Sequence, residues 1–118
     1  MGYSRMRQKI KVFISSPYSI GDKRENLKRH MDSAFELMKA DFIPFVPLLY
    51  SYMDDIYEMS YSEWLIQTTS WIESCDVVLR LPGESNGCEK EEKVARNKGI
   101  PIVYSIGALK IWAEDLPF

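Results

Sequence analysis

Residues 75–103 read CDVVLRLPGESNGCEKEEKVARNKGIPIV and contain a complete strand–helix–strand pattern. The apolar run Asp76–Leu81 is typical of a buried parallel strand, and the turn-forming residues Pro82–Gly87 end it. The spacing then predicts a polar helix over Cys88–Asn97 and another apolar strand over Ile100–Ser105. Two strands joined through a helix form a βαβ unit, so this stretch predicts a parallel sheet.

The residues upstream continue the same alternation of strands and helices. A first buried strand is predicted over Lys9–Ser15, followed by a helix that begins at Asp22, a suitable N-cap. Phe42–Val46 predicts a short second strand, and its internal Pro44 places that strand at the edge of the sheet because proline lacks a backbone donor. Residues 47–60 have no clear hydrophobic period and are expected to form a long loop with at most one helical turn.

The next helix completes the order of elements. It is predicted to begin at Ser60 or Ser62 and to present Trp64, Trp71 and Cys75 on one apolar stripe. With a short closing helix near the end, the chain predicts an α/β three-layer sandwich with a four- to five-stranded parallel sheet. Its strand order is expected to be 2-1-3-4, as in flavodoxin-like and Rossmann-like folds, with residues 1–118 as one domain.

Composition excludes several classes of protein. The 118 residues carry 15 Lys plus Arg against 17 Asp plus Glu, so the net charge of -2 does not favour nucleic acid as a partner. The longest apolar run, residues 42–50, is too short to span a membrane, and the basic N-terminal segment does not resemble a signal peptide. We therefore expect a cytoplasmic protein without a nucleic-acid or membrane partner.

Few residues of the chain suit metal or thiol chemistry. Two cysteines and one histidine supply neither a disulfide framework nor a zinc ligand set, so no metal and no cofactor is expected. Cys75 is expected to be buried, and Cys88 lies at a helix start, where its pKa would fall. His30 lies among charged residues of the first helix and is expected to be exposed to solvent.

Ligands of open parallel sheets bind at the carboxyl ends of the strands, where the strand order reverses. In a 2-1-3-4 order the loops Ser15–Asp22 and Pro82–Gly87 meet there. The second loop opens a helix whose free backbone N–H groups suit a phosphate or another anion. The phosphate-binding P-loop, the dinucleotide-binding glycine motif and a Ser-His-Asp triad are not found, which leaves carboxylates as the catalytic candidates.

Three glutamates follow the Gly87 turn. Glu89 and Glu92 each precede a basic residue by four positions and are typical of charge pairs on a helix surface. Glu91 has Ala95 at that spacing, and the helix dipole is expected to keep its carboxylate ionised and available as a nucleophile. The alternative is an ordinary solvated glutamate in the first turn of the helix.

The chain resembles the nucleoside 2-deoxyribosyltransferase-like superfamily. The resemblance extends from about Lys9 to Tyr104 and rests on VFISSPYS at the end of the first strand and on the pattern S-x-G-x-x-x-E-x-x-x-A, met by Ser85, Gly87, Glu91 and Ala95. Within this superfamily the chain is most similar to small bacterial and phage proteins and, more distantly, to 2'-deoxynucleoside 5'-phosphate N-hydrolases.

The resemblance implies cleavage or exchange of the N-glycosidic bond of a (deoxy)nucleoside or its 5'-monophosphate through a covalent glycosyl-Glu91 intermediate. The implied substrate-binding residues are Ser15, Ser16, Tyr18, Ser85 and Gly87. The partner would be a small-molecule nucleoside or nucleotide. Members of the superfamily form homo-oligomers, so a homodimer or higher homo-oligomer is expected.

Two positions depart from the pattern of the superfamily. Thr68 stands where an aspartate usually helps the base to leave, so the candidate proton donors are Glu63, Asp54 and Asp55. Tyr18 stands where the N-hydrolases have a phosphate-binding arginine, although Lys23 and Arg24 follow closely. These departures support an alternative function as a non-catalytic nucleotide-binding or regulatory domain on the same scaffold.

The remaining aromatic residues allow two interpretations. Trp64 and Trp71 lie seven positions apart and are expected to be core residues rather than a stacking platform for a base. The tyrosines of the polar segment that follows the second strand could cover a base or form a subunit interface. These tyrosines are Tyr50, Tyr52, Tyr57 and Tyr61.

Overall fold

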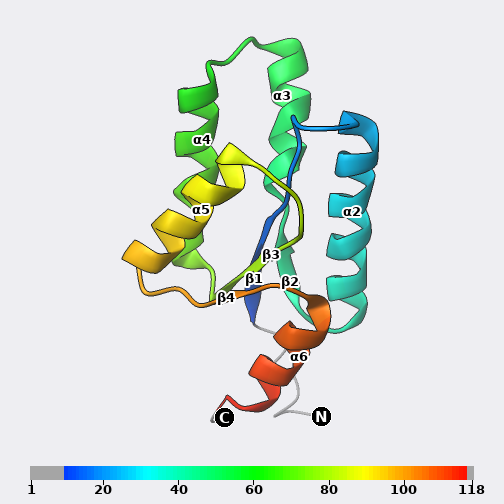
Figure 1. Cartoon of the computed structure of the whole chain (residues 1–118), viewed down its shortest axis with the longest axis vertical. Helices are drawn as coiled ribbons and strands as arrows, with labels where there is room; N and C mark the ends of the chain where they lie inside the picture. The colour runs from blue at the N-terminus through cyan, green and yellow to red at the C-terminus, as the bar shows by residue number, and fades with distance from the viewer. Residues whose placement is uncertain (1–9, 117–118) are drawn as a thin grey trace.

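Four parallel strands form the sheet of the computed structural model, which describes residues 10–116 (Figure 1). They are β1 (Lys11–Ser15), β2 (Ile43–Phe45), β3 (Val77–Arg80) and β4 (Ile102–Val103). Their order is β2-β1-β3-β4, which confirms the predicted fold class and strand order. Lys9 and the basic N-terminal segment lie outside the described residues.

The central strand β1 joins the two halves of the sheet. It pairs in parallel with β2 on one side and with β3 on the other, where Ser15 lies opposite Arg80. Pro44 lies on β2 at the edge of the sheet, as predicted. Residues 12–15 of β1 are all buried, because helices cover both faces of the sheet.

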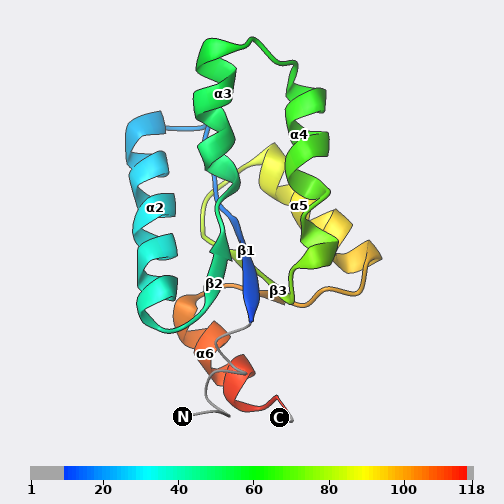
Figure 2. The ribbon, with the colours of Figure 1, turned by 180° about the vertical axis from the view of Figure 1, so that it is seen from behind.

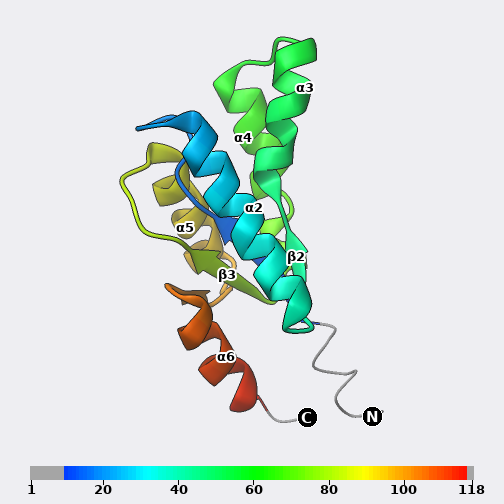
Figure 3. The same cartoon turned by 90° about the vertical axis from the view of Figure 1, so that its right-hand side faces the viewer.

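Two hydrophobic cores lie on opposite faces of the sheet. Figures 1, 2 and 3 show that helices lie on both sides of the sheet. Val12 and Ile14 pack against α2 (Lys23–Lys39) and α6 (Ile106–Glu114), whereas Phe13 packs against Ala95 of α5 (Asn86–Asn97). This alternation follows from the two-residue period of a strand. The three layers predicted from the sequence are therefore present.

The segment predicted as a long loop is helical instead. It contains the 3-10 turn η1 (Pro47–Leu49) and helix α3 (Tyr50–Ile56), and α4 (Tyr61–Thr69) follows. Helix α3 buries only Ser51 among its residues, so the sequence carries no apolar stripe that would reveal it. Figures 1 and 2 show α3 and α4 as a pair of helices that extends beyond the carboxyl ends of the strands.

Helix α4 is shorter than predicted. A capping box between Ser60 and Glu63 begins it, but it ends at Thr69, and the separate 3-10 turn η2 (Ile72–Ser74) carries the chain to β3. Trp71 therefore leaves the predicted stripe and is 45% exposed, with its ring stacked on Phe45 at 5.2 Å. Within residues 10–116, no helix has both the length and the apolar character that a bilayer crossing requires.

Candidate active site

A cleft of about 160 Å³ lies at the carboxyl ends of the strands, where the strand order reverses. We call it the Glu91 cleft. Its walls come from the β1–α2 loop and the start of α5, which were predicted to meet here, and from η1 and α4. Its lining residues are Ser16, Tyr18, Ser19, Ile20, Leu48, Tyr61, Trp64, Ser85, Asn86, Gly87, Cys88 and Glu91.

The start of α5 forms the floor of this cleft. Ser85 is the N-cap, and its Oγ accepts a hydrogen bond from the backbone N–H of Cys88 at 3.1 Å. A methyl group on Gly87 would lie 3.5 Å from the Tyr61 hydroxyl and 3.7 Å from Ser85 Oγ. A side chain at position 87 would therefore fill space between these two hydroxyls.

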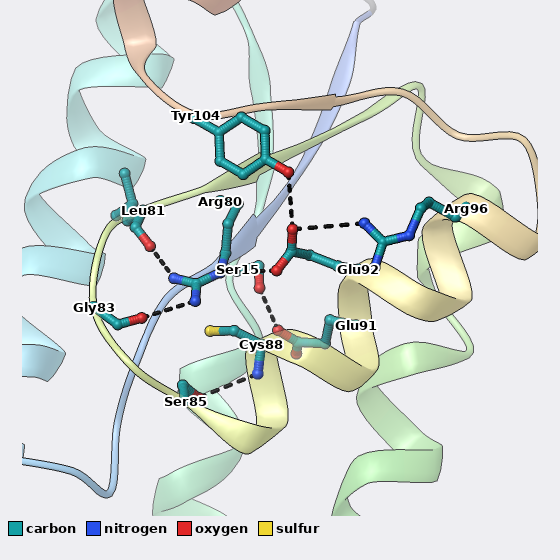
Figure 4. Close-up of polar contacts among 10 residues, drawn as sticks. All are labelled: Ser15, Arg80, Leu81, Gly83, Ser85, Cys88, Glu91, Glu92, Arg96 and Tyr104. Carbon is teal, nitrogen blue, oxygen red and sulfur yellow. Dashed lines mark hydrogen bonds and ion pairs between the residues drawn. The ribbon is translucent and has the colours of Figure 1, made fainter.

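Glu91 lies one turn further along α5, and its carboxyl group is buried rather than solvated. The residue is 8% exposed, and Ser15 Oγ donates a hydrogen bond of 2.6 Å to its Oε1 (Figure 4). Burial raises the pKa of Glu91 to about 7, although the Ser15 hydrogen bond and the charge of Arg80 act in the opposite direction. The carboxyl group is therefore not held fully ionised near pH 7, as the helix dipole was expected to hold it, because loss of solvation raises its pKa.

Arg80, at the end of β3, holds the loop that precedes α5. Its guanidinium donates to the backbone oxygens of Leu81 and Gly83, and its Nε lies 3.3 Å from Glu92 Oε2 (Figure 4). Tyr104 donates a 2.9 Å hydrogen bond to the other oxygen of Glu92. The predicted pair of Glu92 and Arg96 is present at 3.8 Å, but Glu92 is largely buried in this network rather than solvated on the helix surface.

Sequence reasoning missed the role of Arg80 in holding the loop before α5. The signal was present, since Arg80 is the one charged residue in the apolar strand VVLR. A charge retained at the end of a buried strand requires partners, and here the partners are loop carbonyls and a carboxylate.

The β1–α2 loop brings the predicted residues Ser16 and Tyr18 to the cleft. Asn26 holds this loop because its side-chain amide donates to the backbone oxygens of Tyr18 and Ile20. Ser16 Oγ lies 2.6 Å from Nδ1 of His30, which is fully buried. The expectation of an exposed His30 was wrong, because its side chain turns toward the loop and not toward the charged face of α2.

Aromatic side chains line the open side of the cleft. The rings of Tyr18 and Trp64 lie 6.3 Å apart, and Lys90 Nζ lies 4.8 Å from the centre of the Tyr61 ring. Trp64 thus lines the cleft, which differs from the expected core position. Among the four tyrosines of this region, Tyr61 contributes to the cleft, whereas Tyr52 and Tyr57 are exposed.

A second hollow of about 190 Å³ adjoins the Glu91 cleft, and we call it the Asp54 hollow. The two share Tyr18, Ser19, Tyr61 and Trp64 as common lining residues. The Asp54 hollow adds Lys23, Ser51, Asp54 and Met59.

The three candidate proton donors occupy different places. Asp54 lines the hollow, and its Oδ1 accepts a 3.2 Å hydrogen bond from the backbone N–H of Met59. Asp55 is exposed and lines neither space. Glu63 caps α4, and its hydrogen bonds with Ser60 lower its pKa, so it is a poor source of a proton.

Thr68 and the two cysteines do not add an acid or a reactive thiolate to the site. Thr68 is buried, and its hydroxyl donates to backbone oxygens of α4 rather than lining the cleft. Burial raises the pKa of Cys75 to about 11 and also raises that of Cys88, contrary to the expected effect of the helix start on Cys88.

The described part of the chain offers no candidate metal site. Across residues 10–116, no group of three or more histidine, cysteine, aspartate or glutamate side chains is placed to hold a metal ion.

In a comparison with known families, the family model for a domain of unknown function, DUF7768, matches residues 10–105. No curated protein matches the sequence. The matched range includes all four strands and every residue that lines the Glu91 cleft.

Proposed function

The chain belongs to the DUF7768 family, and from its site we propose that it cleaves or exchanges the N-glycosidic bond of a (deoxy)nucleoside or its 5'-monophosphate. The proposal follows the resemblance of the sequence to the nucleoside 2-deoxyribosyltransferase-like superfamily. Glu91 is the proposed nucleophile, and the intermediate is a glycosyl ester of its carboxylate.

One observation carries the proposal: a buried carboxyl group with a pKa raised to about 7 lines a cleft at the strand-order reversal. A nucleophile must be deprotonated, yet a carboxylate of higher pKa attacks more strongly. The Ser15 hydrogen bond occupies one side of Oε1, which fixes the orientation of the carboxylate in the cleft. A surface glutamate would have neither property.

The proposed reaction takes two displacement steps at the anomeric carbon of the sugar. In the first, a Glu91 oxygen forms a bond to this carbon while the N-glycosidic bond breaks, and the base leaves with the bonding electrons and takes up a proton. In the second, water or another base attacks the same carbon and the Glu91 carboxylate leaves. When water attacks, its second proton passes to solvent, and the sugar is released with a hydroxyl group.

The dimensions of the two spaces support a divided binding mode. The Glu91 cleft, at about 160 Å³, matches a sugar better than a complete nucleoside, and ligand pockets of roughly 300–1,000 Å³ are usual for larger molecules. We place the sugar there, with its 5' side near Ser85 and Gly87. The base then lies in the Asp54 hollow against Tyr18, Tyr61 and Trp64.

The proposal is tested by base release from a panel of ribonucleosides, deoxyribonucleosides and their 5'-monophosphates, with and without an acceptor base, followed by chromatography. We expect release from at least one class of substrate. Exchange in the presence of the acceptor would identify a transferase, and release without it a hydrolase. Absence of release from every member by folded protein would contradict the proposal.

Asp54 is the proposed proton donor to the leaving base, because it is the candidate that lines the hollow. Replacing it with asparagine is expected to lower kcat by about 10²- to 10⁴-fold, the usual contribution of general acid catalysis. Asp55→Asn is the matched control on the same helix and should change kcat little. Equal effects of both substitutions on kcat would remove Asp54 from this role.

A non-catalytic nucleotide-binding or regulatory domain is the second candidate function. Thr68 favours it, since this position supplies a hydroxyl bonded to backbone oxygens where the superfamily has a carboxylic acid. In that case a nucleotide would bind the Glu91 cleft and dissociate unchanged. The same panel of compounds distinguishes the two functions, because a binding domain would bind a member of the panel without releasing its base.

The partner and location expected from the sequence remain part of the proposal. We propose a homodimer or higher homo-oligomer in the cytoplasm. Exposed apolar residues on the α3–α4 pair are consistent with a contact between subunits beside the cleft. These residues are Tyr52, Met53, Ile56, Tyr57 and Ile66.

A further inference from the structure

Ser16 and His30 form a buried hydrogen-bonded pair behind the wall of the Glu91 cleft. Ser16 Oγ and His30 Nδ1 lie 2.6 Å apart, and the imidazole is fully buried. Burial lowers the pKa of His30 to about 3, so the ring is neutral near pH 7. A neutral imidazole has one N–H donor and one acceptor nitrogen, and the position of this proton decides what Ser16 offers to the cleft.

Two arrangements of protons satisfy the distance between Ser16 and His30. In the first, Nδ1–H donates to Ser16 Oγ, and the serine proton is free to point into the cleft. In the second, Ser16 donates to Nδ1, Nε2 carries the ring proton, and the serine presents only lone pairs. Across the described residues, the buried Nε2 has no hydrogen-bond partner.

The surroundings favour the first arrangement. Buried N–H groups without a partner are rarer in proteins than acceptors with a free lone pair, which disfavours a proton on Nε2. The neighbouring hydroxyl of Ser15 is already committed to Glu91 at 2.6 Å. In the second arrangement both serines at the end of β1 would donate their hydrogen bonds to Glu91 and His30. Neither serine would then present a donor to the cleft, where the carboxylate of Glu91 already supplies acceptors.

We propose that His30 is a positioning residue whose Nδ1–H donates to Ser16, so that Ser16 donates its own proton to an acceptor oxygen of the bound ligand. The identity of that ligand rests on the proposed function, under which the acceptor is an oxygen of the sugar. The tautomer of His30 does not rest on it.

The first test measures the tautomer directly. His30 is the single histidine of the chain, so long-range ¹H–¹⁵N NMR of uniformly labelled wild-type protein reports its two ring nitrogens without ambiguity. We expect a protonated Nδ1 and an unprotonated Nε2 at pH 7. A proton on Nε2, or on both nitrogens, would overturn the proposal whether or not the protein cleaves a nucleoside.

The second test measures binding of 2'-deoxyuridine and 2'-deoxyadenosine to protein carrying Glu91→Gln, which prevents turnover. On this background His30→Phe removes the Nδ1–H donor, and we expect it to weaken binding about tenfold. We expect the same loss of affinity for Ser16→Ala. His30→Asn retains an N–H group near the position of Nδ1 and should restore most of the affinity. The double variant Ser16→Ala/His30→Phe should be no weaker than either single variant, because both remove the same hydrogen bond.

Equal loss of affinity in His30→Phe and His30→Asn, with both variants folded, would show that His30 only fills space and would overturn the proposal. If neither nucleoside binds while the tautomer is as expected, the proposed substrate is wrong but the positioning of the Ser16 proton stands. The two tests therefore separate failure of this inference from failure of the proposed function.

Discussion

Replacing Glu91 with glutamine is expected to abolish base release while making the folded protein more stable above neutral pH. The amide keeps the size of the side chain and an oxygen that can accept the Ser15 hydrogen bond. It cannot form the glycosyl ester, so we expect kcat to fall by at least about 10³-fold, as for the loss of other nucleophiles.

The stability change follows from the pKa of the carboxyl group. Because the folded-state pKa of Glu91 is raised to about 7, the folded protein holds this proton more tightly than the unfolded chain does. Stability from this group is present at acid pH and is lost as pH rises from about 4.5 to 7. Glu91→Gln avoids that loss and should raise the free energy of unfolding by about 3 kcal/mol at pH 8 but only about 1 kcal/mol at pH 5.

Glu89→Gln is the matched control, since Glu89 is exposed on the same helix and should affect neither base release nor stability appreciably. Urea unfolding at the two pH values measures the stability difference, and the panel measures release. A nucleophilic Glu91 further requires wild-type kcat/KM, which reports on the free enzyme, to rise with pH through about 7. Unchanged release in Glu91→Gln would exclude Glu91 as the nucleophile.

Replacing Gly83 with alanine is expected to destabilise the protein by about 2–5 kcal/mol, the sum of backbone strain and overpacking. Gly83 has a φ of +122°, and a Cβ there would lie 2.7 Å from Cγ of the buried Pro17. Neither loop can give way easily, because Arg80 holds the oxygen of Gly83 and Asn26 holds the β1–α2 loop.

Gly99→Ala separates the two causes of this destabilisation. Gly99 also has a positive φ, +71°, but no atom lies within 4 Å of its added Cβ, so only strain of about 1 kcal/mol is expected. Pro17→Ala combined with Gly83→Ala should recover part of the packing loss, which a double-mutant cycle in urea measures. Equal destabilisation by Gly83→Ala and Gly99→Ala would mean that the two loops are not packed as described.

Much of the fold could be predicted because strands and helices on the sheet leave periodic apolar patterns. The run DVVLRL and the polar helix after Gly87 identified the parallel sheet, and Pro44 identified its edge. Helix α3 could not be predicted, because it buries almost none of its residues and its sequence carries no stripe. The early end of α4 was missed since Trp71 continues the helical spacing although its ring packs on Phe45.

The sequence predicted the site residues that lie at the ends of strands, but not the buried residue that contacts them from α2. Ser15, Ser16, Ser85 and Glu91 meet because the carboxyl ends of β1 and β3 are neighbours, which topology alone implies. The burial of His30 was not predictable, because charged residues surround it in the sequence and its contact with Ser16 depends on the angle between α2 and the sheet. Loss of solvation raises the pKa of Glu91, and a sequence pattern does not show how far a side chain is shielded from water.

The two walls of the Glu91 cleft differ in how firmly the chain anchors them. One wall is built on the sheet and α5, whereas α4 supplies Tyr61 and Trp64 to the other, and α3 lines the adjoining Asp54 hollow. The buried residues of α3 and α4 are only Ser51 and Thr68. Local unfolding of α3 and α4 therefore costs less free energy than global unfolding of the domain. A ligand that contacts both walls raises the free energy of local unfolding of the α3–α4 pair. Ligand binding and folding of this pair are therefore thermodynamically linked.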